Sequence, residues 1–248
     1  MPREGSRVIS SRTELAAHRR LCRSCGAYRC FVAGAVIAFA TAHAPRCQAQ
    51  LQILGSSINL TNFVNTGEDL IVGDKEFTEF SISGSFQASQ VYVTPIEEAG
   101  NYGIRFSGAF AASGSAEDMS LTYAVNVTNS ANLISAANLL FNGQVTFGTG
   151  LAQIVEQVFT NNDFAVPAGQ LQVFASIASN KYADSVSITP PQPFLDLSKD
   201  VLLYAQVPAF ATISTIDQTF TQVPEPSAVA LLAAGLAALF LLRSRRSD

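Results

Sequence analysis

The sequence has no tryptophan, and its histidines and cysteines are confined to one end. Both histidines, His18 and His43, and all four cysteines lie within residues 1–49 of the 248. Cysteine proteases, Ser-His-Asp hydrolases and histidine-ligated zinc sites each need an imidazole or a thiol. If residues 1–49 are removed on maturation, the remaining chain is excluded from these classes. It also has no disulfide, so its stability must come from packing.

Positive charge is scarce after residue 49. Residues 50–222 contain one Arg and three Lys against fifteen Asp and Glu, a net charge of −11. Residues 1–49 have a net charge of +6 and residues 223–248 a net charge of +1. Binding to a nucleic-acid backbone needs a positive surface that releases counterions. We therefore expect no nucleic-acid partner, and we treat the chain as three segments whose middle part is one globular domain.

The first segment has the charge order of a secretory signal peptide. Four arginines between residues 19 and 29 precede an apolar run at residues 30–42, CFVAGAVIAFATA. A basic region, about 7 to 15 apolar residues and small residues before the cut define such a signal. We predict that residues 1–49 are a signal peptide read by the general secretion machinery. Cleavage after Ala49 is favoured, and Ala42 and Ala44 are the alternatives.

The last 26 residues combine three features in a fixed order. The motif at residues 223–226, Val-Pro-Glu-Pro, precedes an uncharged apolar run at 228–242, which is followed by Arg243, Arg245 and Arg246. The prolines keep the motif extended and deny it helical hydrogen bonds. The apolar run would form a helix about 22 Å long, against a hydrocarbon core of about 30 Å. We predict a single transmembrane helix at 228–242, with the arginines held in the cytoplasm and the body outside.

This tail resembles the PEP-CTERM sorting signal of Gram-negative and related bacteria. Pro224, Glu225 and Pro226 match the triplet that names the family, and residues 211–222 look like the closing strand often seen before the signal. The resemblance implies that exosortase, a membrane-embedded cysteine transpeptidase, recognises this triplet and cleaves near it. It also implies an inner-membrane precursor whose body passes to the cell surface or into extracellular polysaccharide.

Apolar and polar residues alternate along residues 50–222. In residues 119–128, MSLTYAVNVT, the odd positions are apolar, which is typical of a half-buried strand. We predict an all-β body, an antiparallel β-sandwich or jelly roll. Residues 132–141 fit a short helix about as well as a strand. Further strands are expected at 77–86, 90–93, 102–110, 144–147, 154–160, 171–177, 185–189, 201–207 and 212–220, with turns at sites such as 142–143 and 190–193.

Fourteen of the seventeen phenylalanines lie in this body. Without tryptophan to fill it, the core is expected to be built largely from them. The alternative is an exposed aromatic platform on which sugar rings stack.

Carboxylates are the acid–base groups that the body offers. A glycosidase needs two of them about 5 to 10 Å apart across a cleft, and a calcium site needs several oxygens from one or two loops. Residues 67–69 and 196–200 are imaginable calcium contributors, but neither has the Asp-x-Asp-x-Asp rhythm of a dedicated loop. We expect solvated loop charges, with no catalytic residue, metal site or cofactor.

These observations favour a non-enzymatic exported protein, structural or adhesive, at the cell surface or in the extracellular matrix with exopolysaccharide. Two alternatives stay open: a carboxylate-dependent glycan hydrolase, and a domain that remains on its C-terminal membrane anchor. An enzyme should show a deep cleft with facing carboxylates, whereas a matrix protein should show scattered acids.

Overall fold

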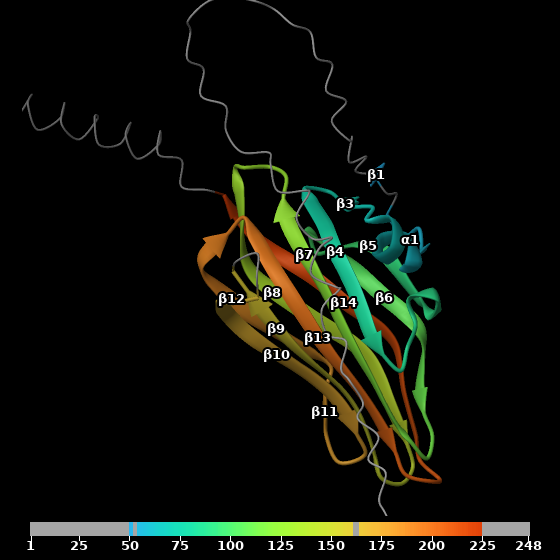
Figure 1. Ribbon diagram of the computed structural model, residues 1–248. Coiled ribbons are helices and arrows are strands. Elements are labelled where there is room, and N and C mark those ends of the chain that lie inside the picture. The colour runs from blue at the N-terminus through green and yellow to red at the C-terminus, as the bar shows by residue number, and fades with distance from the viewer. Residues whose placement is uncertain (1–49, 52–53, 161–163, 225–248) are drawn as a thin grey trace, which may run out of the picture. The chain divides into compact units, whose positions relative to one another are not determined.

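The computed structural model describes residues 50–51, 54–160 and 164–224. Within these residues the chain forms fourteen strands and two short helices, α1 (Thr61–Thr66) and η1 (Ala88–Gln90). The strands build two sheets that pack face to face, and almost all neighbouring strands are antiparallel (Figure 1). The predicted all-β, sandwich-like body is therefore confirmed. The predicted signal peptide at 1–49 and membrane helix at 228–242 lie outside the described residues.

The larger sheet has eight strands, with β7 and β13 side by side near its middle. Their antiparallel register runs from Phe194 opposite Asn126 to Tyr204 opposite Ala116. In spatial order the strands are β1 (Gln50–Leu51), β3 (Leu70–Val72), β4 (Lys75–Gly84), β7 (Ala116–Val127), β13 (Phe194–Ala205), β9 (Gly150–Phe159), β10 (Pro167–Ser176) and β11 (Asn180–Lys181).

The smaller sheet has six strands, and β14 lies within it between β8 and β6. Both of these neighbours pair with β14 in antiparallel orientation. In spatial order the strands are β12 (Ala183–Gln192), β8 (Asn132–Thr146), β14 (Phe210–Pro224), β6 (Asn101–Ala112), β5 (Val91–Glu98) and β2 (Ile58–Asn59).

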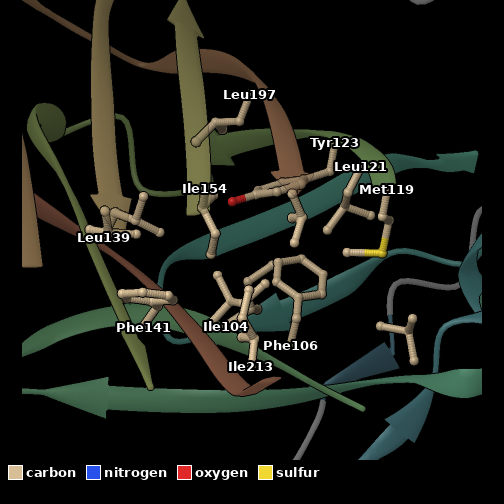
Figure 2. Packing of buried hydrophobic residues seen from close by; sticks show 14 of the residues in the cluster. Ile104, Phe106, Met119, Leu121, Tyr123, Leu139, Phe141, Ile154, Leu197 and Ile213 are labelled. Carbon is tan, nitrogen blue, oxygen red and sulfur yellow. The ribbon is translucent and has the colours of Figure 1, made fainter. Parts of the chain in front are cut away.

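The core lies between the two sheets and follows the predicted alternation. The odd positions of β7 from 119 to 127 are all buried, and the even positions at its ends face outward. Leu121 and Tyr123 of β7 face Ile104 and Phe106 of β6 across the sandwich, and the hydroxyl of Tyr123 ends within this packed layer (Figure 2). The rings of Phe106 and Tyr123 lie 5.6 Å apart between centroids.

The segment that fitted either a helix or a strand is a strand. β8 continues through residues 132–146, and the predicted turn at Asn142-Gly143 is wrong. Leu139 and Phe141 are buried at period two. A Cβ at Gly143 would overlap the ring of Phe141, so this glycine makes room for a core side chain and does not mark a turn.

A β-bulge in β14 changes which residues of that strand face the core. The register with β8 and β6 shifts between Ile213 and Thr215. Before the shift Ile213 is buried, and after it the core positions become Ile216, Gln218 and Phe220. An extra residue in one strand reverses the parity of all that follows, so simple alternation could not locate these positions.

Two further expectations about turns are corrected. The proline-rich residues 190–193 were predicted as a turn, but β12 runs to Gln192 and takes up the irregularity as a register shift between Ser187 and Gln192. Residues 196–200, considered as a loop, lie inside β13.

The expectation of a phenylalanine-built core is largely confirmed. Nine of the fourteen phenylalanines in the body are buried, whereas Phe147, Phe164 and Phe210 are exposed. Contacts between rings link the two sheets: Phe77 of β4 lies 6.0 Å from Phe220 of β14 between ring centroids.

Removing one of these rings should destabilise the body. Phe106→Ala leaves a cavity between the sheets, and we expect the free energy of unfolding to fall by about 3 to 5 kcal/mol. The matched control is Tyr92→Ala on the neighbouring strand β5, whose side chain is exposed and whose loss should change stability by less than about 0.5 kcal/mol. Urea denaturation measures both. Equal effects of the two substitutions would contradict the described packing.

Candidate functional site

The motif predicted at residues 223–226 begins inside the last strand. β14 continues to Pro224, so that Val223 lies opposite Leu133 and Pro224 opposite Asn132 of β8. Val223 is 37% exposed, and Pro224 is also exposed. The strand thus runs two residues past residue 222 and leads directly from the sandwich into the motif. No free linker separates the folded sheet from the first two motif residues.

One carboxylate ties this end of β14 to the rest of the sandwich. Asp74 lies in the turn between β3 and β4, and its Oδ2 accepts hydrogen bonds from Gln222 Nε2 at 2.8 Å and Asn132 Nδ2 at 3.1 Å. Its Oδ1 forms an ion pair with Lys75 Nζ at 2.7 Å. We call these four residues the Asp74 cluster. The cluster joins β4, β8 and β14 within two residues of Pro224.

The Asp74 carboxylate is held in its ionised form. Partial burial alone would raise the pKa of Asp74, but the hydrogen bonds from Lys75, Gln222 and Asn132 outweigh it and lower the pKa below the ordinary 3.8. Burial lowers the pKa of Lys75, and its contact with Asp74 opposes that change. The side chain of Lys75 has no exposed surface, so Asp74 is the group that compensates its buried charge.

The remaining predicted sorting residues lie outside the described residues. These are Glu225, Pro226, Arg243, Arg245 and Arg246. In the part of the chain that the structure describes, no helix combines the length and the apolar character that crossing a membrane requires.

A surface hollow of about 570 Å³ lies where β5 ends beside β6. Its walls include Glu97, Glu98 and Arg105. Arg105 forms two hydrogen bonds to Asp217, from Nε to Oδ1 and from Nη2 to Oδ2, both at 2.6 Å. Glu97 and Glu98 are consecutive in one strand, where successive side chains point to opposite faces. They therefore do not form a pair of carboxylates that face each other across a cleft.

The considered calcium contributors at 196–200 do not converge on one point. Asp196 and Asp200 lie four residues apart on β13, which separates them by about 13 Å at 3.3 Å per residue. Asp196 is buried, so the expectation of a solvated charge is wrong for it, and Asp200 is exposed. Over residues 54–160 and 164–224, no group of three or more acidic residues is placed to hold a metal ion.

The middle of the core contains four polar side chains that sequence analysis did not single out. They are Lys199 of β13, Glu156 of β9, Gln218 of β14 and Tyr123 of β7, all 0% exposed, and we call them the buried polar cluster. Lys199 and Glu156 are directly opposite in the β13–β9 register and form an ion pair. Lys199 Nζ donates a hydrogen bond to Gln218 Oε1 at 2.5 Å and lies 5.8 Å from the centroid of the Tyr123 ring.

Burial changes the proton affinity of this cluster. It lowers the pKa of Lys199 and raises the pKa of Glu156, while the attraction between the two opposes both changes. Within this cluster, three buried atoms have no hydrogen-bond partner: Tyr123 Oη, Glu156 Oε1 and Gln218 Nε2. A signal was present in the sequence, because Lys199 takes a core-facing position in the alternation of β13 between apolar residues.

The tail is similar to a known sorting family. The PEP-CTERM protein-sorting motif matches residues 222–246, which begin at Gln222 of the Asp74 cluster. The chain carries a PEP-CTERM sorting domain. Such a motif indicates an exported protein that exosortase sorts. No curated protein matches the chain.

Three solved structures are similar to this chain at a low level. TmCBM61, solved with β-1,4-galactotriose, has 15% identity and a TM-score of 0.29 over 67% of this chain and 98% of its own. The mannan-recognising module TmCBM27 has 10% identity and a TM-score of 0.30 over 68% and 98%. The enzymatically active domain of bacteriophage CBA120 tailspike protein 4 has 12% identity and a TM-score of 0.24. The match covers 67% of this chain and 21% of the tailspike chain. Similarity this low supports no inference about what the body binds or does.

Acid should loosen the end of β14 through Asp74. Because its folded pKa lies below 3.8, the ionised carboxylate stabilises the folded protein above about pH 4, and this contribution is lost as the pH falls through the lowered value. The free energy of unfolding should fall between pH 6 and pH 3 in both proteins. We expect this fall to be smaller by roughly 1 kcal/mol in Asp74→Asn than in the wild type. Urea denaturation at both pH values measures it, with Asp200→Asn as the exposed control. Equal pH dependence in the wild type and Asp74→Asn would contradict the role of the cluster.

Proposed function

We propose that this protein is a structural or adhesive component of the cell surface or extracellular matrix, associated with exopolysaccharide after exosortase cleaves near residues 224–226. The observation that carries the proposal is the continuity of β14 with the PEP-CTERM motif. The folded sandwich is the cargo, and the signal begins within its own sheet. The precursor is anchored in the inner membrane by the apolar segment at 228–242, and cleavage releases the body.

The distribution of carboxylates supports a body without enzymatic activity. Glu97 and Glu98 are consecutive on one strand, Asp196 and Asp200 are far apart on another, and Glu156 is enclosed in the core. None of these sets offers the two facing carboxylates of a glycosidase. The hollow beside Glu97 and Glu98 is the place that favours the alternative, a glycan hydrolase, and the experiment below examines it directly.

The charge of the surface favours a neutral polysaccharide as the partner. Of the four basic residues in 50–222, Lys75 and Lys199 are buried. The other two form ion pairs, Arg105 with Asp217 at 2.6 Å and Lys181 with Asp184 at 2.7 Å. The excess charge that the surroundings meet is therefore negative, and it repels polyanionic chains.

One end of the sandwich offers an uncharged apolar surface for this contact. Phe147, Val207 and Phe210 are 71%, 80% and 43% exposed, and we call these three residues the apolar end. The connections that carry them are adjacent, because Gln206 N donates to Thr149 O at 2.9 Å. Residues 146–150 and 205–210 contain no charged side chain. Exposed apolar patches mark interaction sites, and aromatic rings supply the large flat area on which a sugar can stack.

The apolar end lies far from the sorting motif. β14 begins at Phe210 and finishes at Pro224, and fifteen strand residues span about 50 Å at 3.3 Å per residue. The proposed contact surface and the signal that exosortase reads are therefore at opposite ends of one strand, so neither obstructs the other.

Sorting should depend on the acidic residue of the motif. In cells that contain the exosortase, we expect the wild-type protein to lose its tail near Pro224 and Glu225→Ala to remain as an uncleaved, membrane-bound form. Immunoblotting of membrane and released fractions measures both products. Glu98→Ala is the control, because this glutamate is exposed on the body and its loss should leave processing unchanged. Equal processing of Glu225→Ala and the wild type would contradict the proposed recognition.

The purified protein should bind a neutral polysaccharide without degrading it. In a panel of extracellular polysaccharides, we expect replacement of both Phe147 and Phe210 by Ser to weaken binding roughly tenfold, since each stacking ring contributes about 0.5 to 1.5 kcal/mol. Tyr92→Ser, which removes an exposed ring from β5, is the matched control. Binding assays and product analysis are run together.

Two outcomes would overturn this part of the proposal. Absence of binding to every polysaccharide tested would contradict the association. Turnover that disappears in Glu97→Gln or Glu98→Gln would establish the hydrolase and place its reaction at the hollow.

A further inference from the structure

The buried polar cluster contains an amine, that of Lys199, in contact with both a primary carboxamide and a carboxyl group. We propose that Lys199 and Gln218 join in an intramolecular amide bond between the two sheets, with Glu156 transferring the protons. The bond would be a covalent modification of the core. It is independent of the sorting route and of any polysaccharide partner.

The geometry brings nucleophile and electrophile together. Lys199 Nζ lies 2.5 Å from Gln218 Oε1, the oxygen bonded to the carbonyl carbon Cδ that the amine must attack. Gln218 comes from β14 of the six-stranded sheet, and Lys199 from β13 of the eight-stranded sheet. The pair therefore lies across the sandwich, where a bond would connect the two layers.

The carboxyl group is placed to move protons. Glu156 Oε2 contacts Lys199 Nζ, and the β13–β9 register places the two residues directly opposite each other. Among the described residues, neither Glu156 Oε1 nor the leaving nitrogen, Gln218 Nε2, has a hydrogen-bond partner. Both are buried polar atoms that folded proteins normally satisfy. The reaction uses these two atoms, one as the proton carrier and the other as the departing group.

The surroundings are dry and aromatic. All members of the cluster are 0% exposed, and the ring of Tyr123 lies against the rings of Phe80 and Phe106, each at 5.6 Å between centroids. Burial lowers the pKa of Lys199 and raises that of Glu156. A proton passing from the ammonium to the carboxylate yields the neutral amine and the neutral acid, and a neutral amine is the nucleophilic form.

The reaction balances without any other reactant. The amine lone pair of Lys199 attacks Cδ of Gln218, a C–N bond forms, and Glu156 donates its proton to the carbonyl oxygen. Glu156 then takes a proton from Nζ and delivers it to Nε2. The Cδ–Nε2 bond breaks and ammonia leaves, while the proton on the former carbonyl oxygen returns to Glu156 as the C=O bond re-forms. One amine and one primary amide become one secondary amide and one ammonia. No oxidant or reductant is consumed.

The carboxyl of Glu156 is the poorer choice of electrophile. If Lys199 condensed with Glu156, no carboxyl group would remain in the cluster to carry protons, because a glutamine amide cannot do so at neutral pH. The two reactions release different molecules, ammonia from Gln218 and water from Glu156, so their products differ in mass.

Such a bond would serve a body that has no cysteine after residue 49. It would close a segment of 19 positions that contains the connection from β13 to β14 and the exposed residues Val207 and Phe210. It would also hold β14 covalently, six residues before the motif begins to leave the sheet at Pro224. A covalent link across the sheets is what a disulfide would otherwise supply to an exported domain.

Intact-mass spectrometry of the denatured full-length protein and of its processed form tests the bond. We expect a mass below that of the sequence by one ammonia, about 17 Da, and a cross-linked peptide that contains both Lys199 and Gln218 in tandem spectra. Trypsin should no longer cleave after Lys199. Location by tandem spectra is essential, because cyclisation of an N-terminal Gln50 also releases ammonia.

Variants separate the roles. Lys199→Met cannot form the bond, and Glu156→Gln keeps the shape but removes the proton carrier, so neither should show the loss at this site. Gln222→Asn changes a glutamine of the same strand that lies outside the buried polar cluster. This variant should still show the loss of ammonia at Lys199 and Gln218. The wild type decides the matter even if a variant fails to fold. An unmodified Lys199 in folded wild-type protein would overturn the proposal, and loss of water located at Lys199 and Glu156 would overturn the assigned electrophile.

Discussion

A lysine in the middle of an apolar core is the constraint on which the arrangement of the two sheets depends. Taking an ammonium group out of water costs several kcal/mol even after the protein relaxes, and the cost is offset only by a well-placed counter-charge and further hydrogen bonds. Lys199 obtains the counter-charge from Glu156 of its own sheet and a carbonyl oxygen from Gln218 of the other. Both contacts require one register between β13 and β9 and one placement of β14. A slip by one residue would turn these side chains to the outer face, so the cluster selects the observed pairing from other pairings that the apolar pattern allows.

β14 connects the structural and the sorting roles of the chain. It is an interior strand of its sheet, paired with β8 and β6. The bulge in β14 turns Gln218 toward the core. The preceding residue, Asp217, accepts a hydrogen bond from Arg105 on the opposite face of the sheet. Near the end of the strand, Gln222 donates a hydrogen bond to Asp74. The strand is paired on both sides as far as Thr219 and with β8 alone from there to Pro224, so folding of the body sets where the first motif residues lie.

The surface follows from how the few basic residues are used. Two of the four in the body are buried beside carboxylates, and the other two are in ion pairs. An acidic exterior with an apolar end would suit the proposed contact with a neutral polysaccharide at that end. Net charge of one sign keeps copies apart, whereas the apolar end offers area that does not depend on charge.

The sequence alone was sufficient for the features that depend on local pattern. Alternation in residues 119–127 predicted the buried face of β7, and the Pro224–Pro226 triplet predicted the sorting class. It was insufficient where contacts between distant residues decide the outcome. Asn142-Gly143 was predicted as a turn because the ring that covers Gly143 is visible only in the folded sheet. The buried polar cluster joins residues 43 and 19 positions apart. These meet because β13 pairs with β9 and faces β14, and that pairing is set by the packing of the whole sandwich, which no local pattern encodes.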